Sequence, residues 1–185
     1  MRSLFLNVGT IPMATMILTR EGYKKLKEEF TYLWTVLRPD VTEKVSWAAS
    51  LGDRSENADY QYNKRYLRQI DNRLRHLGIV FDKSKIVDYN PVQEGTVYFG
   101  AYVELENDDG ETKTVRIVGS EEIYGRKDYI SVDCPLAKAM LGHKVDDEIN
   151  VHAPQGIITW YVSKISYKKE SWYKEEITST EITRL

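Results

Sequence analysis

The sequence has a single cysteine, Cys134, among its 185 residues. A disulfide therefore cannot form within the chain, which fits a reducing cytosol, and we expect a cytoplasmic protein. There is no apolar run long enough to span a bilayer, so we expect no membrane partner. The mildly apolar start, residues 1–16, is interrupted by Gly9 and Pro12, unlike a secretory signal, and we interpret it as a disordered extension.

Neither sign of charge dominates the chain, whose formal net charge is −2. The two signs are unevenly distributed, however. The first 85 residues contain 15 basic and 10 acidic residues, and the remaining 100 contain 11 and 18. This asymmetry favours a polyanion as the partner of the first half and a basic surface as the partner of the second. With 42% hydrophobic and 29% charged residues, the composition is that of a globular protein with one sizeable domain or two small ones.

Two helical patterns occupy the first half, and Thr19 is a plausible N-cap for the first. Pro39 interrupts this first pattern, which predicts one kinked helix or two stacked helices ending near Gly52. Steps of three and four residues define an apolar seam in each pattern. The first seam is Tyr23, Leu26, Phe30, Leu33, Leu37, Val41, Val45 and Ala48, and the second is Tyr60, Asn63, Leu67, Ile70, Leu74, Leu77 and Phe81.

Two seams joined by a short polar link predict a long antiparallel coiled-coil hairpin over residues 17–84. At 1.5 Å per residue, each arm would be roughly 40–50 Å long, with an acidic tip at residues 52–60. Ala48 and Ala49 replace larger side chains near this end, so we expect the tip to be slim.

After Lys85 the pattern changes to short runs typical of strands. The sequence Asn107–Gly110 predicts a hairpin turn, and Pro135–Leu141, followed by Gly142, predicts one short helix. We therefore expect an α+β fold, with the hairpin followed by a β-rich domain over residues 85–167. Residues 168–185 show no period and form a tail of unknown role. The expected strands cover residues 85–89, 96–106, 112–118, 128–132, 148–152 and 157–167.

Three acidic residues, Asp53, Glu56 and Asp59, lie within seven positions at the expected tip. Carboxylates are the ligands that Mg²⁺ prefers, and two at this spacing could share a metal with ligands from a partner and polarise its water. They are too few to hold the metal alone. The same Asp-x-x-Glu spacing is also a capping box, in which Asp53 would cap the second helix while Glu56 reaches back. The two interpretations are compatible.

The run from Trp47 to Lys64, which reads WAASLGDRSENADYQYNK, resembles the tip of the bacterial transcript cleavage factors of the GreA/GreB family, most closely its GreB branch. The resemblance covers about residues 17–167. Further matching runs are Thr19–Tyr23, Lys85–Tyr89, Phe99–Ala101, Glu106–Gly110 and Gly125–Ser131.

This resemblance implies an FKBP-like C-terminal domain that docks on the RNA polymerase core, while the coiled coil of a monomeric factor enters the secondary channel. The polymerase then cleaves the 3′ end of backtracked RNA, so the factor itself is not an enzyme. By resemblance, Asp53 and Glu56 match two tip acids that support the second Mg²⁺ and its attacking water. No cofactor would be bound stably by the chain alone. Asp133 and Pro135 match a loop taken to contact polymerase.

The second helix also carries a run of basic residues. At 100° per residue, Lys64, Arg68 and Arg75 fall within roughly 40° of one another, and Arg65 is nearby in the sequence. These four residues are candidates for binding RNA phosphates, as the resemblance implies, although a solvated helix face has the same composition. Tyr66 interrupts the run, so we expect a weaker patch than in close relatives.

Two other functions remain open from the sequence. A channel-binding inhibitor of polymerase could share the hairpin and an acidic tip without stimulating cleavage. A coiled-coil scaffold with a β-rich binding module would bind no polymerase and would tolerate changes at the tip.

Overall fold

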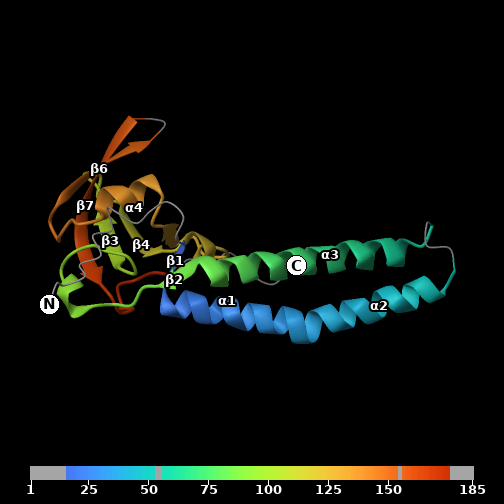
Figure 1. The fold of residues 1–185 in the computed structure, drawn as a ribbon. Helices are drawn as coiled ribbons and strands as arrows, with labels where there is room; N and C mark the ends of the chain where they lie inside the picture. Colours follow the sequence, from blue (N-terminus) through green and yellow to red (C-terminus); the bar gives the residue numbers. More distant parts are fainter. Residues whose placement is uncertain (1–15, 53–55, 154–155, 176–185) are drawn as a thin grey trace. The chain divides into compact units, whose positions relative to one another are not determined.

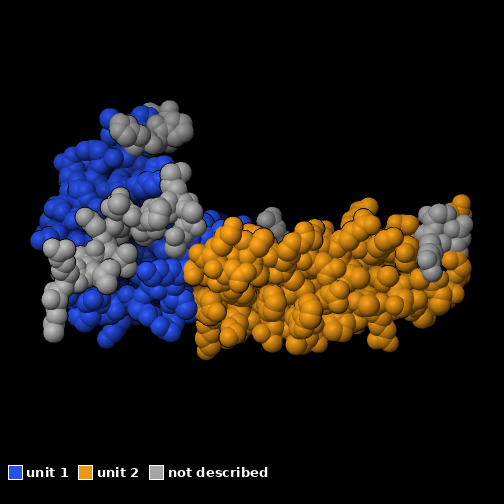
Figure 2. Space-filling model, viewed as in Figure 1, with its two compact units in different colours: residues 1–20, 85–182 blue, residues 21–84, 183–185 orange. Residues whose placement is uncertain are grey.

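The computed structural model describes residues 16–52, 56–153 and 156–175 (Figure 1). The chain divides into two compact units, which Figure 2 shows in different colours. Among the described residues, the helical unit contains 21–84, and the β unit combines 16–20 with 85–175. The expected α+β class, a helical hairpin followed by a β-rich domain, is confirmed.

The first arm of the hairpin is one continuous helical segment with a widened turn. Helix α1 (Arg20–Tyr32) leads into a π-helical turn, η2 (Leu33–Leu37), and then into α2 (Arg38–Ser50). Arg38 N–H donates to Leu33 O, five residues back. Pro39 follows directly, and its ring would clash with a carbonyl four residues back in a regular helix. The first arm therefore bends here, as Figure 1 shows, and the expected kink is realised as a π-turn.

The second arm is α3 (Ala58–Lys83), and its apolar seam faces that of the first arm. The predicted seams account for most of the buried residues of the hairpin: Leu26, Leu33, Val41 and Ala48 on the first arm, and Ile70, Leu74 and Leu77 on the second. Gly22 and Val80 are also buried and lie outside the predicted seams. Burying a leucine or isoleucine side chain contributes about 2 kcal/mol to the free energy of unfolding. None of the helices in the described part of the chain is both long and apolar enough to cross a membrane.

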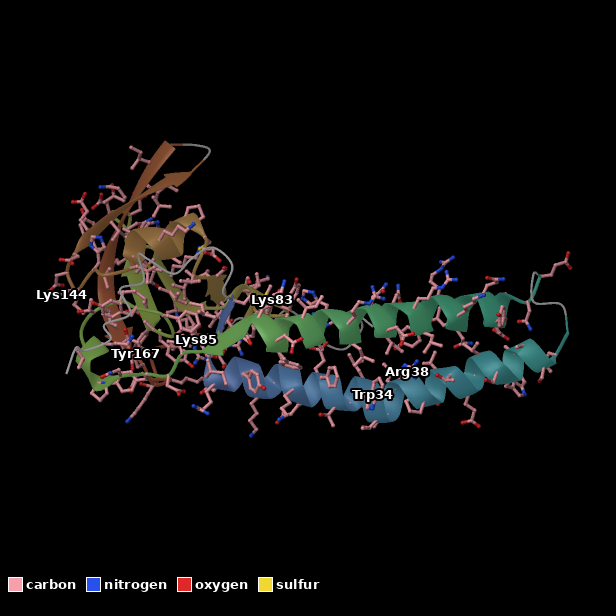
Figure 3. The ribbon with its side chains drawn as sticks, in the orientation of Figure 1. Trp34, Arg38, Lys83, Lys85, Lys144 and Tyr167 are labelled. Atoms are coloured by element: carbon pink, nitrogen blue, oxygen red, sulfur yellow. The ribbon has the colours of Figure 1, made fainter. Side chains whose placement is uncertain are left out.

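Polar and aromatic contacts support the seam from both sides. Glu29 accepts two hydrogen bonds from Arg73, at 2.7 and 2.8 Å. Arg38, labelled in Figure 3, donates to Asp71 Oδ1 at 2.8 Å, and its guanidinium lies 5.6 Å from the Trp34 ring centroid. Far from the tip the seam is aromatic: Phe81 packs edge-on against Tyr23 and Phe30, with centroids 5.4 and 5.8 Å apart. The buried seam thus changes from aromatic side chains at this end to Ala48 near the tip.

The β unit is built on a five-stranded sheet in the order β5-β4-β3-β7-β6. Neighbouring strands are antiparallel except β4 and β5, which are parallel. Helix α4 (Pro135–Met140) contributes Ala137 and Met140 to the same core cluster as Val103 and Ile117 of the sheet. The strands are β3 (Tyr102–Glu106), β4 (Thr112–Val118), β5 (Tyr129–Ser131), β6 (Glu148–Ala153) and β7 (Gly156–Ser166).

The β3–β4 connection is the hairpin turn that the sequence predicts. Asn107 Oδ1 accepts from the backbone N–H groups of Asp109 and Glu111, at 3.1 and 2.8 Å. Gly110 has a φ of 77°, a conformation that favours glycine. The turn residues therefore fix the register of the two central strands.

A two-stranded sheet pairs β1 (Met16–Leu18), which the sequence analysis missed, with β2 (Ser84–Ile86), which overlaps the strand expected over residues 85–89. Ile17 enters the core of the β unit, and a Cβ on Gly119 would lie 2.1 Å from the Ile17 carbonyl oxygen. Thr19 donates from its N–H and its hydroxyl to the Glu122 carboxylate, at 2.8 and 2.5 Å. Burial raises the pKa of Glu122, and these bonds partly oppose that rise.

Part of the expected tail also belongs to the β unit. Tyr173 is buried, its ring is edge-on to Tyr102 at 4.7 Å, and its hydroxyl donates to Asp128 Oδ2 at 2.8 Å. Arg126 binds the same carboxylate at 2.8 and 2.6 Å. Burial alone would raise the pKa of Asp128, but the hydrogen bonds from Arg126 and Tyr173 outweigh it, so the pKa is lowered. The segment around Tyr173 is thus packed as a structural part of the domain.

Candidate functional site

The hairpin tip is organised by one residue that sequence reasoning missed. Asn57 is the N-cap of α3, and its Oδ1 accepts from Tyr60 N–H at 3.0 Å. Its Nδ2 donates to Ala48 O, at the end of α2, at 2.9 Å. One side chain therefore satisfies an orphan donor of α3 and gives Ala48 O a second donor beside Leu51 N–H, which lies at 3.3 Å. Asparagine is among the preferred N-caps, so this signal was present in the sequence.

The predicted capping box of Asp53 and Glu56 is wrong for α3. An N-cap immediately precedes the first helical residue, and α3 begins at Ala58, so Asn57 holds that position. Glu56 lies in the turn before the helix and is exposed. Asp53 lies outside the described residues. Glu56 therefore takes no part in the N-cap of α3.

The third acidic residue, Asp59, is exposed in the first turn of α3. A carboxylate there interacts favourably with the helix dipole. Among the described residues, no group of three or more acidic, histidine or cysteine side chains is placed to hold a metal ion. The acidic residues at the tip, Asp53, Glu56 and Asp59, supply carboxylate oxygens, which suit Mg²⁺, but they are too few for a complete site. A metal here would therefore need ligands from a second molecule.

The candidate RNA-binding residues differ in what they contact. Lys64 lies over the Tyr60 ring, with its Nζ 5.1 Å from the centroid. Arg65 and Arg68 are exposed, and Arg75 donates to Asn72 Oδ1 at 3.0 Å. All four residues lie on the same helix, α3.

The remaining predicted site lies in the β unit, between β5 and α4. Asp133 is exposed, and its N–H donates to Ser131 Oγ at 3.2 Å. Pro135 is exposed at the start of α4, where its missing N–H costs nothing. Cys134 caps this helix, with its Sγ accepting from Ala137 N–H at 3.3 Å. The loop is therefore a firmly anchored, exposed ridge.

Comparison with known proteins gives matches along most of the chain. The family model described as the transcription elongation factor N-terminal domain matches residues 16–86, and the one described as the GreA/GreB C-terminal domain matches residues 92–167. Transcription elongation factor GreB of Vibrio cholerae is 61% identical over 158 residues, which span 85% of this chain and 98% of the relative. GreB of Pseudomonas putida is 59% identical over 155 residues, spanning 84% and 96%.

Solved structures also match. The crystal structure of GreA factor homolog 1 of Thermus thermophilus is 23% identical, with a TM-score of 0.38. The match covers 82% of this chain and 99% of that one.

Proposed function

This chain belongs to the GreA/GreB family of transcription elongation factors, and from that premise we propose that it stimulates cleavage of backtracked RNA by RNA polymerase. The β unit would dock on the polymerase core through the ridge that carries Asp133 and Pro135. The hairpin would enter the secondary channel. The cleaved bond would be near the 3′ end of the RNA, in the polymerase active site. The factor would add ligands to that catalytic site, which belongs to the polymerase.

The observation that supports this proposal most directly is that the Glu56 carboxylate is exposed and is not used to cap α3. Glu56 precedes the helix, and Asn57 performs the capping that could have occupied it. Asp53 and Glu56 would offer oxygens to a Mg²⁺ that the polymerase holds with its own ligands, and this metal would activate the attacking water. The chain's own contribution is to carry these carboxylates on a stalk whose end is held by the Asn57 hydrogen bonds.

The proposal is tested with stalled, backtracked elongation complexes carrying labelled RNA. We expect Asp53→Asn and Glu56→Gln to retain polymerase binding but to lose most of the cleavage stimulation, because amides are poor Mg²⁺ ligands. Asp59→Asn is the matched control: it removes one exposed acid from the same tip, within the first turn of α3, and should leave most of the stimulation.

The outcome also separates the alternatives. Full stimulation by both tip variants would contradict the role of the two acids. Slowed elongation without any cleavage by the unmodified chain would indicate an inhibitor, and absence of polymerase binding would indicate a scaffold.

A further inference from the structure

Two tyrosines on α3 take no part in the proposed function. Tyr62 and Tyr66 are one helical turn apart, and their ring centroids lie 6.3 Å apart with a tilt of 31°. Tyr62 is 69% exposed. Neither belongs to the apolar seam, which passes through Asn63, Leu67 and Ile70. Tyr66 is half-buried, so the pair presents an aromatic surface made mostly by Tyr62 beside the seam, although Tyr66 seemed from the sequence only to interrupt a basic run.

The surroundings of this pair are basic. Between Asp59 and Asp71, α3 contains Lys64, Arg65 and Arg68 and no acidic residue. Arg65 and Arg68 are exposed, and at 100° per residue Arg65 lies roughly 60° around the helix axis from Tyr62. Exposed cations beside the rings suit a polyanion that also carries flat, apolar groups.

The first arm adds an ion pair near Tyr66, with no net charge. Lys44 on α2 is close enough to Tyr66 to interact with it electrostatically. Lys44 also pairs with Asp40 at 2.7 Å. Burial raises the pKa of Tyr66, so its phenol is neutral at physiological pH and does not repel phosphates.

We propose that Tyr62 and Tyr66 form a stacking platform for unpaired bases of single-stranded RNA, whose phosphates contact Arg65 and Arg68. Exposed aromatic rings alternating with cations are how proteins bind single strands without reading sequence, because every base has a flat face. This inference rests on and deepens the proposed function, since a backtracked RNA has an extruded single strand. In this view Tyr66 adds base stacking to a patch that would otherwise bind by charge alone.

The experiment compares two probes of equal charge: a fluorescent adenine RNA of about 12 nucleotides and an abasic ribose-phosphate oligomer of the same length. Fluorescence anisotropy with the full chain gives the Kd for each. A stacked base contributes about 1–3 kcal/mol, so we expect the RNA to bind on the order of tenfold more tightly than the abasic oligomer. The double variant Tyr62→Leu/Tyr66→Leu should abolish this difference while leaving abasic binding unchanged.

A charge swap separates stacking from electrostatics. Tyr66→Arg adds a cation and removes a ring, so it should weaken binding of the RNA and strengthen binding of the abasic oligomer. Tyr66→Phe should behave as the unmodified chain. Tyr124→Leu is the matched control, because Tyr124 is 68% exposed but lies in the β unit. Circular dichroism of each variant verifies that the hairpin is folded.

Equal Kd values for the two probes, tighter binding of both by Tyr66→Arg, or no RNA binding at all would each overturn the platform. The measurement uses neither polymerase nor the tip acids. Its failure is therefore distinguishable from failure of the cleavage assay with Asp53→Asn and Glu56→Gln.

Discussion

In the β unit, Asp128 and Glu122 are largely enclosed and receive hydrogen bonds from side chains and backbone, whereas Glu56 at the end of the hairpin is exposed. The buried carboxylates have their lone pairs occupied by Arg126, Tyr173, Thr19 and Gly119. A carboxylate used in this way stabilises the fold but cannot bind anything else. These two carboxylates of the β unit are thus committed to the fold, whereas Glu56 keeps its oxygens exposed, as the proposed metal ligation requires.

The contrast between the two units assumes that each is stable by itself. It would not hold if the hairpin depended on the β unit for its stability. Leu77 is fully buried in the seam, and Leu77→Ala should lower the free energy of unfolding of the hairpin by about 4 kcal/mol, through lost burial and the cavity left behind. Hydrogen exchange measured by mass spectrometry should show faster exchange in α1, α2 and α3, with the sheet unchanged. Equal acceleration in both units would mean that they unfold together.

A substitution in the β unit should destabilise the β unit and leave the hairpin unaffected. Asp128→Asn leaves the nearly buried Arg126 guanidinium without its main carboxylate, and we expect a loss of about 3 kcal/mol, because Glu175 still accepts from Arg126 at 3.1 Å. Thermal unfolding followed by the near-ultraviolet signal measures it. Hydrogen exchange in the hairpin should be unaffected, and an equally destabilised hairpin would contradict the separation.

The same residue predicts a dependence on pH. Because the folded state lowers the pKa of Asp128, its contribution is present above the usual pKa of about 3.8 and is lost as the pH falls through the folded value. The difference in stability between the unmodified chain and Asp128→Asn should therefore shrink below about pH 4. Urea unfolding at a series of pH values checks this, and a constant difference down to pH 2 would show that Asp128 is not the titrating group.

The smallest effect is expected at the tip. Asn57→Ala removes the cap on Tyr60 N–H and the hydrogen bond that joins α3 to Ala48 O of α2, and we expect a loss of about 1 kcal/mol. Asn57→Asp retains the acceptor for Tyr60 N–H but loses the donor to Ala48 O, so it separates the two contacts. Exchange of the amides at the start of α3 is the readout. If both variants exchange like the unmodified chain, the tip is held by other contacts.

Local patterns were sufficient to predict much of the fold. The seam residues from Tyr60 to Phe81 predicted α3, and the Asn107–Gly110 turn predicted the β3–β4 hairpin. Features made by residues far apart in the chain were missed, such as the pairing of β1 with β2 and the contact of Tyr173 with Asp128. Periodicity describes one segment. The pairing of the two helical seams was predicted because a short link joins them, and no such link connects β1 to β2 or Tyr173 to Asp128.

The candidate site was predicted in part, for a related reason. Acidic residues at a turn are visible in the sequence, but the choice of N-cap between Asp53 and Asn57 depends on where the helix begins, and helix ends are set within one or two residues by tertiary packing. The Asn57 bond to Ala48 O could not be predicted without that boundary. The contact between Tyr62 and Tyr66 was not predicted, because the two rings share a surface only once the helix is formed.

The π-turn at Leu33–Leu37 has a consequence for how the length of this protein can vary. Such a turn is equivalent to one residue inserted into a regular helix. The extra residue is accommodated within the one widened turn. A homologue lacking one residue in this stretch could close the turn into an ordinary helix and still bring its distal seam residues to the partner arm. The number of residues in the first arm could therefore change by one during evolution, while the reach of the hairpin and its pairing with the second arm stay nearly the same.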